Sequence, residues 1–109
     1  MPRENGLPPG TLALLILRLL DAGPLHGYAI AQRIHVLSRE ELSVEEGSLY
    51  PALQKLLLNG WVKAAWATSE SGREVREYRL TPAGRKQLAS ALHDYRRTSV
   101  AIDQVLDNA

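Results

Sequence analysis

The chain has 109 residues, of which 45% are hydrophobic and 23% are charged. This length supports one domain with a real core and is too short for two. The chain has no cysteine, which excludes disulfides and thiolate metal sites, and its histidines at 26, 35 and 93 do not have the spacing of metal ligands. We therefore expect no metal and no other cofactor.

Charge and hydropathy restrict the location and the partners. A formal net charge of +1 and a pI near 8.1 permit an anionic partner without requiring one. The first ten residues, MPRENGLPPG, lack the apolar core of a signal peptide. The longest apolar run, LALLILRLL, is interrupted by Arg18 and is far shorter than the ~20 residues that span a bilayer. We expect a cytoplasmic protein with no membrane partner.

The N-terminal part of the chain reads as an arm followed by two helices. Residues 1–8 are polar with two prolines, which predicts a flexible arm. A helix is predicted from Thr11 to Ala22, closed by the Gly23-Pro24 pair. Because leucines occupy every side of it, this helix should be buried on two faces. His26–Leu37 has apolar residues at i, i+4 and i+7 and predicts a second helix.

A third helix is predicted over about residues 44–59. Its leucines share one face, Ser43 and Glu46 match a capping box, and Asn59 with Gly60 supplies a left-handed stop. The opposite face points outward and carries Gly47, Ser48, Pro51, Gln54 and Lys55, with Tyr50 at its edge.

Pro51 leaves two readings of where this helix begins. It could kink a helix that starts at Ser43 and remove the bond to the Gly47 carbonyl, or the helix could restart with Ser48 as its cap. Either way, an interior proline costs about 3 kcal/mol relative to alanine and would be wasteful in a segment that only fills a core. The outward residues suit a DNA duplex instead, because glycine allows close approach and the polar side chains reach phosphates or base edges.

Alternating residues on both sides of TSESG predict a β-hairpin with its tip near residues 70–73. Arg73 and Arg76 lie in or beside this tip, where they could contact phosphate, although neighbouring glutamates dilute the positive charge. Trp61 and Trp66 are predicted to pack in the core or along the strands, as aromatic residues at alternating strand positions usually do.

The last helix should begin with Thr81 as its cap and Pro82 at its first position, and run to about Leu106. At 1.5 Å per residue it would be roughly 37 Å long and overhang a small body. Its apolar residues keep the 3,4 spacing of a helix-packing seam if Ser99 is admitted, so we predict a homodimer. The predicted interface is Leu12, Leu15, Ile16 and Leu19 of the first helix with Leu88, Leu92, Tyr95, Ile102 and Leu106 of the last.

This order of elements predicts a mainly α fold with a small β-hairpin: a winged helix-turn-helix domain at residues 9–81 and a dimerisation helix at residues 82–109. In helix-turn-helix proteins the recognition helix enters the major groove while the preceding helix braces the backbone. The third helix is therefore the expected DNA contact.

Three segments, PLHGYAIAQRI, GSLYPALQKLLLNGWV and REYRLTPAGRKQL, resemble the signature blocks of the PadR-like family of bacterial transcriptional regulators. The resemblance implies a winged-helix dimer that binds a pseudo-palindromic operator, usually as a repressor, and is often released by a small ligand. It places the recognition helix on Gly47–Lys55, adds Tyr28 as a contact and puts the wing on Ser69–Arg76. The last helix lacks the tryptophan with which some drug-binding relatives stack flat ligands, so multidrug sensing is not expected.

Two other functions are weighed against this reading. Glutamates at 40, 41, 45 and 46 lie close to the start of the third helix and repel phosphate. These acidic residues favour the alternative that the chain is a winged-helix module that binds another protein through its C-terminal helix. An enzyme is excluded, because no predicted element brings a nucleophile, a base and an orienting group together.

Overall fold

The computed structural model describes residues 7, 8 and 10–109. Most of the arm predicted for residues 1–8 therefore lies outside the described residues. The helices are α1 (Thr11–Asp21), α2 (Gly27–Leu37), α3 (Glu46–Leu58) and α4 (Pro82–Asn108), and the strands are β1 (Leu25–His26), β2 (Val62–Thr68) and β3 (Glu74–Leu80). The predicted mainly α fold with a small hairpin is confirmed.

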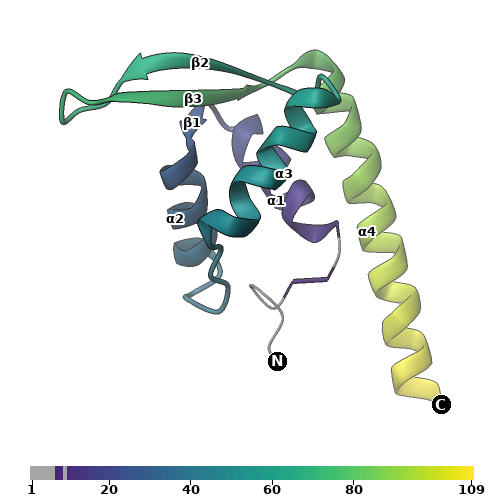
Figure 1. Cartoon of the computed structure of the whole chain (residues 1–109). Helices are drawn as coiled ribbons and strands as arrows, with labels where there is room; N and C mark the ends of the chain where they lie inside the picture. The colour runs from purple at the N-terminus through teal and green to yellow at the C-terminus, as the bar shows by residue number, and fades with distance from the viewer. Residues whose placement is uncertain (1–6, 9) are drawn as a thin grey trace.

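Helices α1, α2 and α3 form a body on one side of the sheet, and α4 runs down the edge of that body and extends past it (Figure 1). The hairpin of β2 and β3 runs across one end of α2 and α3, and its tip extends past α2 on the side away from α4 (Figure 1). No helix among the described residues is both long enough and apolar enough to cross a membrane.

A single apolar core explains why these segments fold together. Every helix and the two long strands contribute to it, because the apolar residues of each recur on one face. The buried apolar side chains are Leu14, Ile16, Leu17, Leu20, Ile30, Ile34, Leu49, Leu53, Leu56, Val62, Tyr78 and Leu88. Burial of such side chains contributes about 1.5–3 kcal/mol each.

The sheet has the order β1-β3-β2 and is antiparallel throughout. In the hairpin, Val62 pairs with Leu80 and Thr68 pairs with Glu74, so the tip falls at residues 69–73 as predicted. The two-residue strand β1 was not predicted. It pairs Leu25 with Tyr78, and this contact ties the start of α2 to the base of the hairpin.

The start of α3 differs from both readings of the sequence. The helix begins at Glu46 with Glu45 as its N-cap, so neither the Ser43 capping box nor a restart at Ser48 occurs. Pro51 lies inside the helix and cannot donate to the Gly47 carbonyl. The predicted stop is correct, because Gly60 has φ 73° and the amides of Gly60 and Trp61 donate to the carbonyls of Leu57 and Leu56.

The link between α2 and α3 explains the late start. Arg39 and Glu40 both have positive φ, 54° and 67°, which makes a tight turn after α2. Ser38 Oγ accepts from the Leu42 amide at 3.0 Å, and His35 Nδ1 donates to the Leu42 carbonyl at 2.9 Å. The extended segment that follows delays helical geometry until Glu46.

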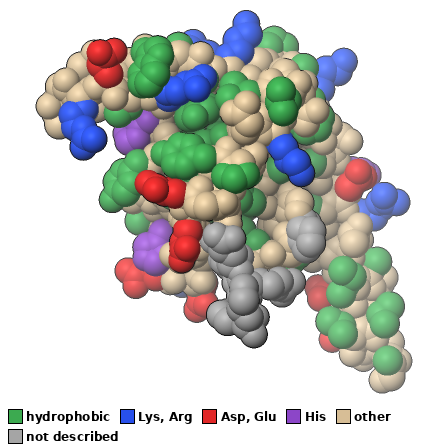
Figure 2. All heavy atoms as spheres, in the orientation of Figure 1, with side chains coloured by type: hydrophobic (Ala, Val, Ile, Leu, Met, Phe, Trp, Pro, Cys, Tyr) green, Lys and Arg blue, Asp and Glu red, His purple; other side chains and the backbone are tan. Residues whose placement is uncertain are grey.

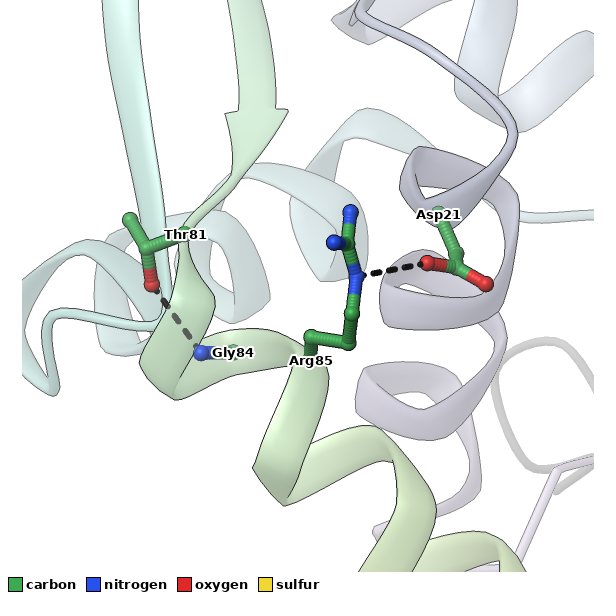
Figure 3. A network of polar contacts seen from close by, with 4 residues as sticks. All are labelled: Asp21, Thr81, Gly84 and Arg85. Atoms are coloured by element: carbon green, nitrogen blue, oxygen red, sulfur yellow. Dashed lines mark hydrogen bonds and ion pairs between the residues drawn. The ribbon is translucent and has the colours of Figure 1, made fainter.

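The predicted cap of α4 is confirmed and fixes that helix to the body. Thr81 Oγ accepts from the Gly84 amide at 3.0 Å and donates to the Gly60 carbonyl at 2.7 Å. Arg85 Nε donates to Asp21 Oδ1 at 3.2 Å, which joins α4 to the end of α1 (Figure 3). A Cβ on Gly84 would overlap the Trp61 carbonyl oxygen, so only glycine allows this approach.

Two residues of the predicted dimer interface belong instead to the core. Ile16 is fully buried and Leu88 is 6% exposed, because both face the inside of the chain's own fold. They offer no surface to a partner, which corrects that part of the prediction. The remaining seven residues are half-buried or exposed: Leu12, Leu15, Leu19, Leu92, Tyr95, Ile102 and Leu106.

Candidate nucleic-acid interface

The outward face of α3 is the first part of the candidate site. Leu49, Leu53 and Leu56 anchor the helix in the core, which turns the residues between them to the surface. Gly47, Pro51, Gln54 and Lys55 are exposed and Ser48 is half-buried. An exposed helix face with an amide, an ammonium and an uncovered backbone can donate hydrogen bonds to bases and phosphates.

Tyr50 sits at the edge of this face and packs on the start of α2. A Cβ built on Gly27 would lie 2.8 Å from the Tyr50 hydroxyl oxygen, so the phenol occupies space that only a glycine leaves open. Burial raises the pKa of Tyr50, and the charge of Glu46 and the proximity of Tyr78 act in the same direction. The hydroxyl therefore stays protonated and can donate to an anion at neutral pH.

The hairpin is the second part of the site. Arg73 lies at its tip, where Ser69 Oγ accepts from the Arg73 amide at 3.2 Å and holds the turn closed. Arg76 lies on β3 with its guanidinium 5.9 Å from the centre of the Tyr78 ring, a cation–π distance. Both arginine side chains are exposed, so both are available to phosphate.

Trp66 is placed differently from the prediction. Its side chain is 69% exposed, because this part of β2 projects beyond the helices that cover Val62. Trp61 is half-buried and packs against the core as expected. Tyr28, at the start of α2, is 68% exposed on the same side as the hairpin's inner face, and both aromatic residues line a shared groove. The alternation of residue types along β2 does not reveal which part of the strand the helices cover.

Acidic residues lie next to this surface, as the sequence indicated. Glu40, Glu41, Glu45 and Glu46 are exposed before and in the first turn of α3. Glu45 and Glu46 lie at the N-terminus of α3, where the helix dipole stabilises negative charge. Figure 2 shows acidic side chains on the same face as the hydrophobic side chains between the hairpin and α3.

The predicted contacts therefore fall on one side of the molecule, at α3, the start of α2 and the hairpin. A groove of about 420 Å³ joins these elements and is lined by Tyr28, Tyr50, Gln54 and Arg76, among others. Arg73 lines a neighbouring groove with Tyr28 and Glu46. No cluster of three or more His, Cys, Asp or Glu side chains suitable for a metal occurs within residues 7, 8 and 10–109.

Three helices, a projecting hairpin and a long C-terminal helix define a winged helix-turn-helix protein. The model of the transcriptional regulator PadR-like family matches residues 16–90. The chain belongs to this family, which places it among regulators of transcription and not among enzymes. The resemblance of the three sequence blocks is thereby confirmed.

Individual relatives agree with this assignment. A transcriptional regulator from Clostridium thermocellum has a TM-score of 0.80 and 29% identity, with 87% of this chain and 92% of that chain covered. A PadR family transcription regulator from Clostridium difficile has a TM-score of 0.77 and 26% identity, with 89% and 99% covered. An uncharacterized 37.1 kDa protein in a Streptomyces fradiae transposon is 42% identical over 79% of this chain. The chain spans 23% of that protein's length.

Proposed function

We propose that the chain is a homodimeric DNA-binding repressor. It places α3 in the major groove of a pseudo-palindromic operator and rests the hairpin, residues 69–76, on the DNA backbone. The observation that carries this proposal is the composition of the outward face of α3, where Gly47, Pro51 and Gln54 serve no purpose in the chain's own packing.

The residues of α3 divide into two roles. Gly47 and Ser48 lie in the first turn of the helix, where exposed amides and a hydroxyl suit a phosphate oxygen. Gln54 carries the amide that pairs with adenine edges, and Lys55 carries a point charge suited to the backbone. Tyr28 and Tyr50 add hydroxyl donors from the start of α2 and the edge of α3.

The hairpin arginines supply the positive charge that α3 lacks. Arg73 and Arg76 are exposed on an element that projects beside α3 (Figure 1). Each phosphate that they neutralise releases counterions, so binding should weaken steeply with salt. The glutamates before α3 repel phosphate, which keeps the backbone away from the α2–α3 link and favours contact at the hairpin instead.

The dimer is supported by the end of α4, which no other described residue covers. Tyr95, Ile102 and Leu106 are 51%, 53% and 71% exposed, and hydrophobic side chains gather on the protruding end of the helix (Figure 2). A partner's α4 would cover them. Leu12, Leu15, Leu19 and Leu92 are half-buried and complete the proposed interface, although Leu15 and Leu19 line a groove between α1 and α2. A twofold arrangement would set two α3 helices about 34 Å apart, one turn of DNA.

A groove between α1 and α4 is the proposed place for an effector. It has a volume of about 550 Å³ and is lined by Leu14, Tyr95 and Ile102, with Asp94 and Asp103 at its polar part. Dimerisation would close its open side with the partner's helices, which suits a small molecule that couples to the spacing of the two α3 helices.

Binding tests separate this proposal from a protein-binding adaptor. Duplexes selected from random sequence should bind far more tightly than unselected ones, and Gln54→Ala should relax the choice at one base pair. Lys55→Ala should weaken binding to all duplexes alike. The acidic residues beside α3 favour the adaptor, which light scattering would reveal as a monomer that pairs only with another protein. Equal, salt-insensitive binding to every duplex would contradict the repressor.

A further inference from the structure

Trp66 extends the inner face of the hairpin beyond the body. Val62, Ala64 and Trp66 share one face of β2, opposite Leu80, Tyr78 and Arg76 of β3. The first two of these pairs pack toward the helices, and the third stands clear of them with Trp66 69% exposed. An indole is among the costliest side chains to leave in water, so this position points to a partner surface.

The groove beneath Trp66 is lined on one side by the hairpin and on the other by helices α2 and α3. Trp66, Arg76 and Tyr78 line it from the hairpin, and Tyr28, Tyr50 and Gln54 line it from the helices. Figure 2 shows hydrophobic side chains gathered where the hairpin meets α3, with basic side chains close by. The result is a channel, open to solvent, with aromatic sides and a guanidinium along one edge.

We propose that this channel holds one sugar–phosphate strand of the duplex, with the Trp66 ring against a deoxyribose and Arg76 paired with the adjacent phosphate. The inference rests on the proposed function and adds a DNA contact that the charged residues alone do not supply. Trp66 is then a determinant of affinity that does not read sequence.

The position of Gln54 identifies the occupant. Gln54 lines the same groove, so a duplex whose base edges reach Gln54 must pass one of its strands between α3 and the hairpin. That strand alternates an apolar sugar face with an anionic phosphate, which matches aromatic walls beside a guanidinium. The cation–π contact with Tyr78, at 5.9 Å, holds Arg76 over the inner face. Glu74 lies on the same face of the hairpin, in the next cross-strand pair toward the tip. Its carboxylate repels phosphate there, which favours a position of the DNA strand beside Trp66.

The first test compares binding of Trp66→Ala, Trp66→Phe and Arg76→Ala to one selected and one random duplex over a range of salt. Trp66→Ala should weaken binding to both duplexes by about tenfold, with the slope of log Kd against log salt unchanged because no counterion is displaced. Trp66→Phe should recover most of the affinity. Arg76→Ala should reduce the slope by about one. Because Trp66 is exposed, its variants should melt like the natural chain.

The second test uses the fluorescence of the two tryptophans. Adding duplex should change the emission of the natural chain and of Trp61→Phe, which keeps only Trp66, and should leave Trp66→Phe unchanged. If the natural chain binds duplex while Trp66→Ala binds equally well and the emission does not change, this proposal is overturned and the repressor stands. If the natural chain binds no duplex, the proposed function fails, and this contact fails with it.

Discussion

The body of the molecule buries its apolar side chains, whereas the distal part of α4 exposes them to solvent. Within residues 7, 8 and 10–109, every buried apolar side chain lies between Leu14 and Leu88. From His93 to Ala109 every residue is exposed except Ser99, which is half-buried. The exposed residues include four apolar ones that are each at least 53% exposed: Val100, Ile102, Val105 and Leu106. The body is therefore stabilised by its own packing, whereas the seam at the end of α4 is not covered by any residue that the structure describes.

This difference separates folding from assembly. An isolated helix of about 12–15 residues is marginal in water, so the end of α4 gains most from contact with another chain. Substitutions in the body should change the free energy of unfolding, and substitutions beyond His93 should change association.

The largest effect is expected in the core of α3. Leu53 is 1% exposed, so Leu53→Ala should lower the free energy of unfolding by about 2–5 kcal/mol, from lost burial and the cavity left behind. Leu58 lies on the same helix and is 78% exposed, and Leu58→Ala should stay within about 0.5 kcal/mol of the natural chain. Urea unfolding of both variants measures the contrast, and equal losses would mean that α3 does not pack as described.

On the protruding seam, the double substitution Ile102→Asp with Leu106→Asp should abolish the proposed dimer. Two charges per chain would have to be buried against a partner, which should weaken dimerisation by about 100-fold or more. Sedimentation or light scattering gives the association state. At a concentration where both proteins are monomers, the two should unfold alike, and a large loss of monomer stability would show that the seam belongs to the fold.

At the junction of the two regions, Gly84→Ala should cost about 1–3 kcal/mol, because the new methyl group displaces α4 from the Trp61 carbonyl. The matched control is Ala83→Gly on the exposed side of the same turn, which should cost about 1 kcal/mol through helix propensity alone. Thermal unfolding of the pair tests the contact. A stabilising Gly84→Ala would mean that α4 does not approach the body so closely.

The smallest effect concerns alkaline pH. Burial raises the pKa of Tyr50, so between the unfolded and folded pKa values the folded chain keeps a proton that the unfolded chain has lost. The free energy of unfolding should therefore fall as pH rises past about 10. The Tyr50→Phe variant should lack the part of this fall in the free energy of unfolding that comes from the Tyr50 hydroxyl. Urea midpoints at pH 8 and above pH 10 measure the difference, and identical declines would place Tyr50 in water.

Features set by local chemistry were predictable from the sequence. The Thr81 cap, the Gly60 stop and the hairpin tip each depend on residues within a few positions, and all three are present. Features set by distant contacts were not. The strand β1 exists because Tyr78 pairs with Leu25, and the burial of Ile16 depends on the whole core.

The candidate site shows the same limit. The exposed positions of α3 follow from the spacing of its leucines, so Gln54 and Lys55 could be placed on the surface in advance. The start of α3 could not, because the left-handed turn at Arg39 and Glu40 decides it and neither residue type signals that conformation. The strand pattern predicts packing for Trp66, because it does not reveal how far the strand projects beyond the helices.

Whether the protein presents two copies of α3 to DNA is tested by its footprint on a duplex selected from random sequence. Two identical sets of protected positions, related by a twofold axis and centred about 10 base pairs apart, are the expected result. A single unrepeated protected segment, or selection that enriches no sequence at all, would contradict a dimer that presents two copies of α3 to DNA.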